Sequence, residues 1–329
     1  MSFYRKFGPI TQLQYITIVE FFLKDRLPMA MAPKVQLVLK NSCLLGEGPH
    51  WDDRTNTLLL VDHKSRAVLR WNPVTDDLKT TIVEDPTVGC VVPRKTGGLV
   101  VAAEHRFAFL DEETGKMQTI QECHTEFPAV IFNDGKCDPA GRFWAGSLTP
   151  NPDPDNPPPN DGALYCLSTD HTMDLKVDQV CISNGLSWSP DKRTMYYCDS
   201  FKYTIDAYDY DVDTGNISNM QEVVKFDRMT DGIPDGHTVD VDGNLWVAMF
   251  STGQIIKVDP RTGTKLEYLK ISDTVLKTTS VCFGGPNLDE LYVTSARNDP
   301  LKGRQDMSGC TFKVTELGTK GLPANVYEG

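Results

Sequence analysis

The chain repeats one strand phrase six times, and this repeat constrains the fold more than any other feature. Six apolar segments that follow turn residues share the phrase: 56–62, 97–104, 141–148, 193–200, 243–250 and 289–296. Their equivalent central residues are spaced by 41, 44, 52, 50 and 46 residues: Leu59, Val100, Trp144, Tyr196, Trp246 and Tyr292. Four-stranded propeller blades recur at about 40–50 residues. The sequence therefore predicts an all-β, six-bladed β-propeller in a single domain, and a pair of β-sandwiches is the alternative.

Second hairpins support this interpretation. Their turns are "NPVTDD", "DEETGK", "DVDTGN" and "DPRTGT", and no long amphipathic helix pattern appears after residue 35. We expect the propeller to span residues 31–329 and residues 1–30 to form an N-terminal extension of uncertain structure. The proline-rich segment 149–162 is either a loop or lid at the rim, or an excursion without function.

The charge and the cysteine pattern of the chain indicate which partners and which compartment to expect. The net charge is −12 and no Lys/Arg-rich run occurs, so we expect neither nucleic acid nor a membrane as a partner. The segment "ITIVEFFLKD" is too short and too charged to span a bilayer. The nine cysteines are scattered without a C-x-x-C motif, which favours buried thiols in a reducing compartment. We therefore expect a cytoplasmic monomer.

Four oxygen-bearing residues precede a glycine in related blades. Asn133, Asn184 and Asp235 are each 51 residues apart, and Glu47 lies 86 residues before Asn133. Equivalent positions of successive blades converge on the propeller axis, so these side chains should meet there. Oxygen donors without thiolate or imidazole suit Ca²⁺, Mg²⁺ or Mn²⁺. The alternative is that Asn-Gly and Asp-Gly are simply turn dipeptides.

His237 is a further candidate for this site. It lies two residues after Asp235, so in a strand its side chain would face the same side and could reach the site. A hydrogen-bonded core histidine is the alternative. The segment 206–216 has some features of a calcium loop, but its glycine falls at the wrong position and Met220 occupies the place of the final Glu. A hairpin turn is the better interpretation there.

Several motifs together resemble one known family. "LGEGPHW", "FNDGKCDPAGRFWAG", "ISNGLSWS", "IPDGHTVDVDGNLWVA" and "FGGPNLDELYVTSA" are similar, in order, to the regucalcin (senescence marker protein)/gluconolactonase/luciferin-regenerating-enzyme family, from residue 40 to about 315. The resemblance implies a six-bladed propeller with one divalent cation in its central channel, and it implies lactone hydrolysis. It makes Glu47, Asn184 and Asp235 the metal ligands and lets Asn133 touch substrate or metal-bound water.

Two positions depart from the family pattern. Ile131 stands where the resemblance implies an arginine that holds sugar hydroxyls, and Asn151 stands where it implies a carboxylate. We therefore expect weak activity on aldonolactones, or a preference for a more apolar lactone or ester.

The predicted activity is metal-dependent hydrolysis of a small lactone or ester, with Asp235 as the general base. Ca²⁺ is the first choice of cation, with Zn²⁺, Mn²⁺ and Mg²⁺ as alternatives. The other functions that the sequence leaves open are a calcium-binding regulator or scaffold, a phosphotriester hydrolase and a luciferin-regenerating-like enzyme.

Overall fold

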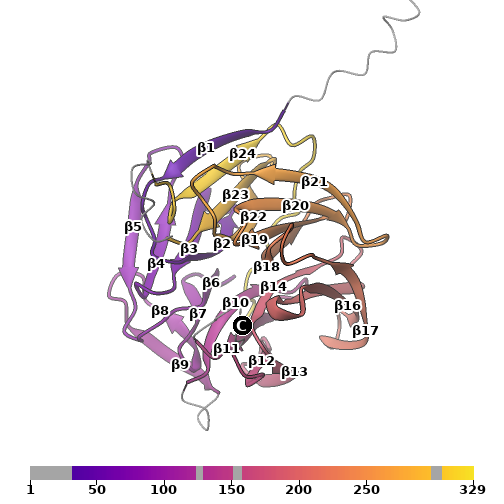
Figure 1. The fold of residues 1–329 in the computed structure, drawn as a ribbon. Coiled ribbons are helices and arrows are strands. Elements are labelled where there is room, and N and C mark those ends of the chain that lie inside the picture. Colours follow the sequence, from indigo (N-terminus) through magenta and orange to yellow (C-terminus); the bar gives the residue numbers. More distant parts are fainter. Residues whose placement is uncertain (1–31, 124–128, 151–157, 298–305) are drawn as a thin grey trace, which may run out of the picture. The chain divides into compact units, whose positions relative to one another are not determined.

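The computed structural model describes residues 32–123, 129–150, 158–297 and 306–329. The predicted extension 1–30 and Asn151 lie outside these residues. Residues 33–329 form one compact unit in which 24 described strands build six four-stranded antiparallel sheets. The six sheets are the blades of a β-propeller, as the repeat predicts (Figure 1).

The first three blades follow one another along the chain. Blade 1 contains β2 (Gly46–Asp52), β3 (Thr57–Asp62), β4 (Ala67–Trp71) and β5 (Leu78–Ile82). Blade 2 contains β6 (Cys90–Pro93), β7 (Leu99–Ala103), β8 (Arg106–Leu110) and β9 (Met117–Glu122). Blade 3 contains β10 (Ile131–Cys137), β11 (Phe143–Leu148), β12 (Gly162–Leu167) and β13 (Met173–Val180).

The last three blades complete the ring. Blade 4 contains β14 (Ser183–Trp188), β15 (Thr194–Asp199), β16 (Thr204–Asp211) and β17 (Asn216–Lys225). Blade 5 contains β18 (Ile233–Val239), β19 (Leu245–Phe250), β20 (Gln254–Asp259) and β21 (Thr264–Lys270). Blade 6 contains β22 (Thr278–Gly284), β23 (Glu290–Ser295), β24 (Thr311–Thr315) and, as its outermost strand, β1 (Lys34–Leu39).

Strand β1 closes the ring. It pairs antiparallel with β24, with Lys34 opposite Thr315, so the earliest described strand lies beside the last one (Figure 1). The six repeated phrases are the second strands of the blades: β3, β7, β11, β15, β19 and β23. The turn sequences found between them join the third and fourth strands of blades 1, 2, 4 and 5.

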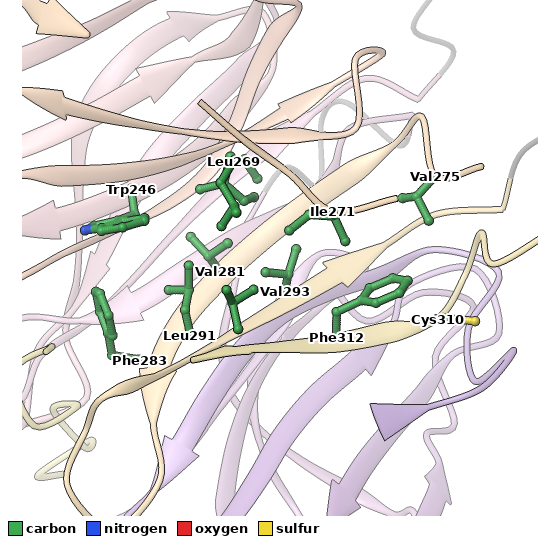
Figure 2. Close-up of a cluster of buried hydrophobic side chains, with 13 residues drawn as sticks. Trp246, Leu269, Ile271, Val275, Val281, Phe283, Leu291, Val293, Cys310 and Phe312 are labelled. Atoms are coloured by element: carbon green, nitrogen blue, oxygen red, sulfur yellow. The ribbon is translucent and has the colours of Figure 1, made fainter. Parts of the chain in front are cut away.

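The core consists of six hydrophobic clusters, one at each interface between adjacent blades. Figure 2 shows the cluster between blades 5 and 6. There Trp246 and Phe283 meet edge to face, with ring centroids 5.9 Å apart and an interplanar angle of 87°. Each blade thus buries its two faces against its neighbours. All nine cysteines are buried and free, as the sequence predicts.

In blades 3 and 5 an aspartate lies three residues before the glycine of the turn that follows the inner strand, as Asp138 before Gly141 and Asp240 before Gly243. Asp138 accepts hydrogen bonds from the backbone of Ala140 and Arg142 and from the indole of Trp144, at 2.9, 2.9 and 3.0 Å. Asp240 plays the same part in blade 5, where the indole of Trp246 donates at 3.1 Å. The aspartate therefore fixes the turn after the inner strand and satisfies a buried tryptophan N–H.

The chain ends in a segment, here called the C-terminal strap (residues 320–329), that contacts several blades. Gly321 forms a bridge with Asp240 of blade 5 and donates from its amide to Leu288 at 2.8 Å. Tyr327 is fully buried, and its amide donates to the carbonyl of Pro93 in β6 of blade 2 at 2.9 Å. The strap therefore crosses from blades 5 and 6 to blade 2 on one side of the propeller.

Helix is scarce in the described part of the chain. It consists of one 3₁₀ turn, η1 (Ser200–Lys202). Among these described residues no helix has the length and apolar character needed to cross a membrane.

Candidate functional site

The candidate site is formed where the inner strands carry a β-bulge. Five of the six inner strands, β2, β10, β14, β18 and β22, carry one extra residue relative to the second strand of their blade. A bulge redirects a side chain and is typical of strands that border a site. Asn133, Asn184 and Asp235 each occupy the first bulged position. Glu47 comes just before the bulge of β2, where Gly48 follows with φ of 51°.

Glycine is needed after these residues because neighbouring inner strands approach closely. A Cβ atom on Gly185 would lie 2.6 Å from the backbone nitrogen of His237 in the next blade. A Cβ on Gly236 would lie 2.5 Å from Cβ of Ser280. Both glycines lie within strands. The alternative that Asn-Gly and Asp-Gly are turn dipeptides is therefore wrong for this structure.

Three buried oxygens at this level have no hydrogen-bond partner among the described residues: Oε2 of Glu47, Oδ1 of Asn184 and Oδ1 of Asp235. Each comes from a different blade, and each residue is only 5% exposed. Buried polar atoms normally have partners, so three orphaned acceptors require an explanation. They are the three residues for which the sequence predicts a cation.

The raised pKa values of Glu47 and Asp235 also favour a bound cation. Burial raises the pKa of the Glu47 carboxyl well above its usual range, and the charges of Asp235 and Asp134 raise it further. Burial also raises the pKa of Asp235, again with help from Asp134, whereas the Gly236 amide and the Asn184 side chain lower it. Closely spaced buried carboxylates without a counter-charge are unfavourable. A bound cation would relieve this cost, so the donor set fits a divalent oxygen-preferring ion.

The amide of Asn184 is an essential part of that set. In the described residues no group of three or more His, Cys, Asp or Glu side chains is arranged to hold a metal ion. A cation in this channel would therefore need the oxygen of Asn184 in addition to the two carboxylates. The Asn184 amide nitrogen donates to Oγ of Ser200 at 2.9 Å, which leaves the oxygen for another ligand.

Asp134 is a site residue that the sequence analysis did not identify. It is 5% exposed, and burial raises its pKa, although the charge of Lys136 and the Gly135 amide oppose this rise. One signal was present in the sequence. Asn184 and Asp235 are followed directly by glycine. In "FNDG" one extra residue, Asp134, stands between Asn133 and the glycine.

The remaining predicted residues lie in the same strands. Asn133 is 7% exposed and donates from Nδ2 to the Ser183 carbonyl at 2.9 Å, which fixes its amide. Ile131 is 7% exposed and lies opposite Leu148 of β11. Its side chain supplies no hydrogen-bond donor at the position where an arginine was expected.

His237 is fully buried in the channel wall. Its Nδ1 lies 3.2 Å from Oγ of Ser187, and burial together with the charge of Lys136 lowers its pKa to about 3. The ring is therefore neutral at physiological pH. The Nδ1 contact matches a hydrogen-bonded core histidine, whereas the buried Nε2 has no hydrogen-bond partner among the described residues, so a role of His237 in substrate binding stays a prediction.

Comparisons with known proteins agree with this architecture. Residues 45–297 match the family model described as "SMP-30/Gluconolactonase/LRE-like region". Regucalcin of Danio rerio is 43% identical over 90% of this chain and 99% of its own length, and regucalcin of Homo sapiens is 41% identical with the same coverage. A solved luciferin-regenerating enzyme is 35% identical, with a TM-score of 0.83 over 91% of this chain and all of that one. The chain belongs to the SMP-30/gluconolactonase/luciferin-regenerating-enzyme family.

Proposed function

We propose that this protein is a divalent-metal-dependent hydrolase of small lactones or esters. The observation that carries the proposal is the set of three orphaned, buried oxygens from Glu47, Asn184 and Asp235, contributed by three blades. Membership in a family whose description includes gluconolactonase supports the reaction class. The substrate would be a small molecule that enters the channel.

Glu47, Asn184 and Asp235 would hold the cation. Ca²⁺ is the preferred ion because the donors are carboxylate and amide oxygens, and Mg²⁺ and Mn²⁺ share this preference. Zn²⁺ is a weaker candidate because the set lacks imidazole and thiolate. When bound, such an ion supplies a Lewis acid that polarises the carbonyl group of the substrate.

The protein must also supply a base. In hydrolysis, a base takes a proton from water, the water oxygen bonds to the carbonyl carbon, and the acyl C–O bond breaks as the leaving oxygen is protonated. Asp235 is the predicted base, but it would also be shared with the cation, which lowers its basicity. Asp134 is the second candidate, because burial raises its pKa and it lies close enough to Glu47 and Asp235 for its charge to raise the pKa of both.

The expected substrate is less hydroxylated than a sugar lactone. Ile131 offers an apolar side chain where an arginine would recognise hydroxyl groups, and unpaired hydroxyls cost binding energy in a buried site. Asn133 is the polar side chain on the same strand that could still orient the substrate.

The test combines a substrate panel with two variants. Hydrolysis of aldonolactones, alkyl lactones and small esters is measured with Ca²⁺, Mg²⁺, Mn²⁺ and Zn²⁺, and cation binding is measured by calorimetry. Asp235→Asn should lose both cation affinity and turnover. Asp134→Asn should retain cation binding, and it should lose turnover if Asp134 is the base. If the wild type binds the cations but hydrolyses no member of the panel, the proposal is wrong and a calcium-binding regulator is the better description.

A luciferin-regenerating-like activity is a second candidate. The 35% identity to a luciferin-regenerating enzyme over 91% of the chain favours it, together with the apolar Ile131. A coupled light-emission assay with purified protein distinguishes the two: sustained light with no lactone or ester hydrolysis would favour this second function.

A further inference from the structure

A cavity of about 320 Å³ lies away from the candidate metal centre. It is lined by the later residues of the inner strands, such as His50, Lys136 and Trp188, and by residues 322–325 of the C-terminal strap. His50 comes three residues after Glu47 on β2, but the bulge between them makes this stretch span only two residues of β3, so His50 lies roughly 7 Å further along the channel. The strap lines the end of the channel opposite to the three orphaned oxygens.

The charge of this cavity is opposite to that of the protein. Its charged lining residues are Lys136 and Lys192, and its lining, all of it within the described residues, includes no Asp or Glu. The whole chain carries a formal charge of −12. A concave site whose charged lining residues are all cations attracts an anionic ligand.

Lys136 is the central cation. Its Nζ donates to the carbonyl of His237 at 2.8 Å, and an ammonium group has three hydrogens, so two remain for other acceptors. It forms no ion pair with a carboxylate of the described residues. Burial lowers the pKa of Lys136, and the charge of Asp134, two residues earlier on β10, opposes this effect.

Two further nitrogens of the lining lack partners. Trp188 is 5% exposed and His50 is 6% exposed, and neither Nε1 of the indole nor Nε2 of the imidazole has a hydrogen-bond partner among the described residues. An indole N–H can only donate. Both residues line the cavity, but these two nitrogens are themselves buried, so Lys136 is the donor that an oxyanion in the cavity would meet.

Much of the remaining lining is apolar. Pro49, Pro190 and Pro323 line the cavity together with Phe283 and Leu322. A pocket of this size with apolar walls and a few polar groups suits one small organic ligand. The walls therefore favour a ligand with an apolar body over a free inorganic ion.

We propose that this cavity binds a small organic anion, with an apolar body against the proline-lined walls and a carboxylate or phosphate group at Lys136. The proposal does not depend on the lactonase function, because none of the three orphaned oxygens takes part in it. Lys192, which is exposed at the rim, adds to the attraction for the anion.

The test uses the full-length protein, freed of divalent ions on a chelating resin. Binding of benzoate and of phenyl phosphate is measured by calorimetry and by thermal denaturation, with benzyl alcohol and inorganic phosphate as controls at matched ionic strength. At least one organic anion should bind at least tenfold more tightly than both controls. Tighter binding of benzoate would identify a carboxylate as the preferred anionic group, and tighter binding of phenyl phosphate would identify a phosphate. Equal binding of benzyl alcohol, or no binding of either organic anion at millimolar concentration, would overturn the proposal.

Variants assign the site. Lys136→Met should weaken anion binding at least tenfold, and Lys192→Glu should weaken it at least threefold. The second variant keeps the hydrogen bond from Lys136 to His237, so it remains informative if Lys136→Met fails to fold. Lys225→Glu makes the same charge change on the outer strand β17, away from the cavity lining, and should bind as the wild type does. If Lys192→Glu and Lys225→Glu have equal effects, the anion binds elsewhere and the proposal fails.

Discussion

The amide nitrogen of Asn184 lies 2.9 Å from the hydroxyl oxygen of Ser200, and that hydroxyl donates to the Pro234 carbonyl at 2.7 Å. Ser200 thus joins the inner strands of blades 4 and 5 directly behind two of the orphaned oxygens. It fixes the Asn184 amide with its nitrogen toward η1 and its oxygen free. We regard Ser200 as a positioning residue for the candidate metal centre.

Removing this hydroxyl should weaken cation binding. A lost hydrogen bond costs about 0.5–1.5 kcal/mol, so Ser200→Ala should lower the affinity for Ca²⁺ about threefold to tenfold. Calorimetric titration with CaCl₂ measures the change. Ser218→Ala, an exposed serine on β17, is the control and should bind Ca²⁺ as the wild type does. Unchanged affinity in Ser200→Ala would show that Asn184 is held by other contacts or is not a ligand.

Cation binding should stabilise the fold through Glu47. With Ca²⁺ at about 100 times its dissociation constant, the free energy of unfolding should rise by about 2.7 kcal/mol. Glu47→Gln should reduce this rise. It should also make the cation-free protein more stable than the wild type at neutral pH, because the raised pKa of Glu47 means that its charge destabilises the fold. Urea denaturation with and without Ca²⁺ measures both effects. A cation-free variant that is less stable than the wild type contradicts this account.

His50 should make the protein sensitive to acid. Burial is the main cause that lowers its pKa from 6.5 to about 4, so the unfolded state binds the proton more tightly. This contribution to stability is complete above pH 6.5 and is lost as the pH falls toward 4, by roughly 3 kcal/mol in total. The difference in unfolding free energy between wild type and His50→Asn, measured from pH 7 to 4, should shrink with falling pH. A difference that does not change with pH would show that His50 titrates normally.

A methyl group at Gly185 should disrupt the contact between blades 4 and 5. Its Cβ would lie 2.6 Å from the backbone nitrogen of His237, and the backbone cannot move aside as a flexible side chain can. Gly185→Ala should therefore cost about 3 kcal/mol, the upper end of what overpacking in a core typically costs. Gly318→Ala is the matched control: no atom lies within 4 Å of its Cβ, and its φ of 67° adds only about 1 kcal/mol of strain. Thermal denaturation of the two variants compares them, and similar melting temperatures would contradict the close approach.

Specificity for sugars should be recoverable at residue 131. Ile131→Arg introduces donors beside Asn133, so kcat/KM for an aldonolactone should rise at least tenfold relative to that for an alkyl lactone. Ile131→Met, which keeps the position apolar, should leave the ratio unchanged. If the arginine variant folds and the ratio does not move, the selectivity of the channel is set by other residues.

The repeat was enough to predict the blades, because an apolar strand after a turn is a local arrangement that recurs in every blade. It also brought Glu47, Asn184 and Asp235 together, since one position per blade faces the axis. Asp134 was missed because the second bulged position of β10 carries a carboxylate where β14 and β18 carry glycine, and a repeat defined by the first bulged residue does not include it. The cavity was missed for a different reason. Its lining includes the C-terminal strap, which lies outside the repeat.

The pairing of β1 with β24 has a consequence for how the chain is made. The ribosome releases Lys34 long before its partner Thr315, so the sixth blade cannot form until translation is nearly complete. A chain that ends shortly before Thr311 lacks β24, so β1 has no partner strand and the ring keeps an unpaired edge. The cell would thus receive either a finished propeller or a substrate for its proteases.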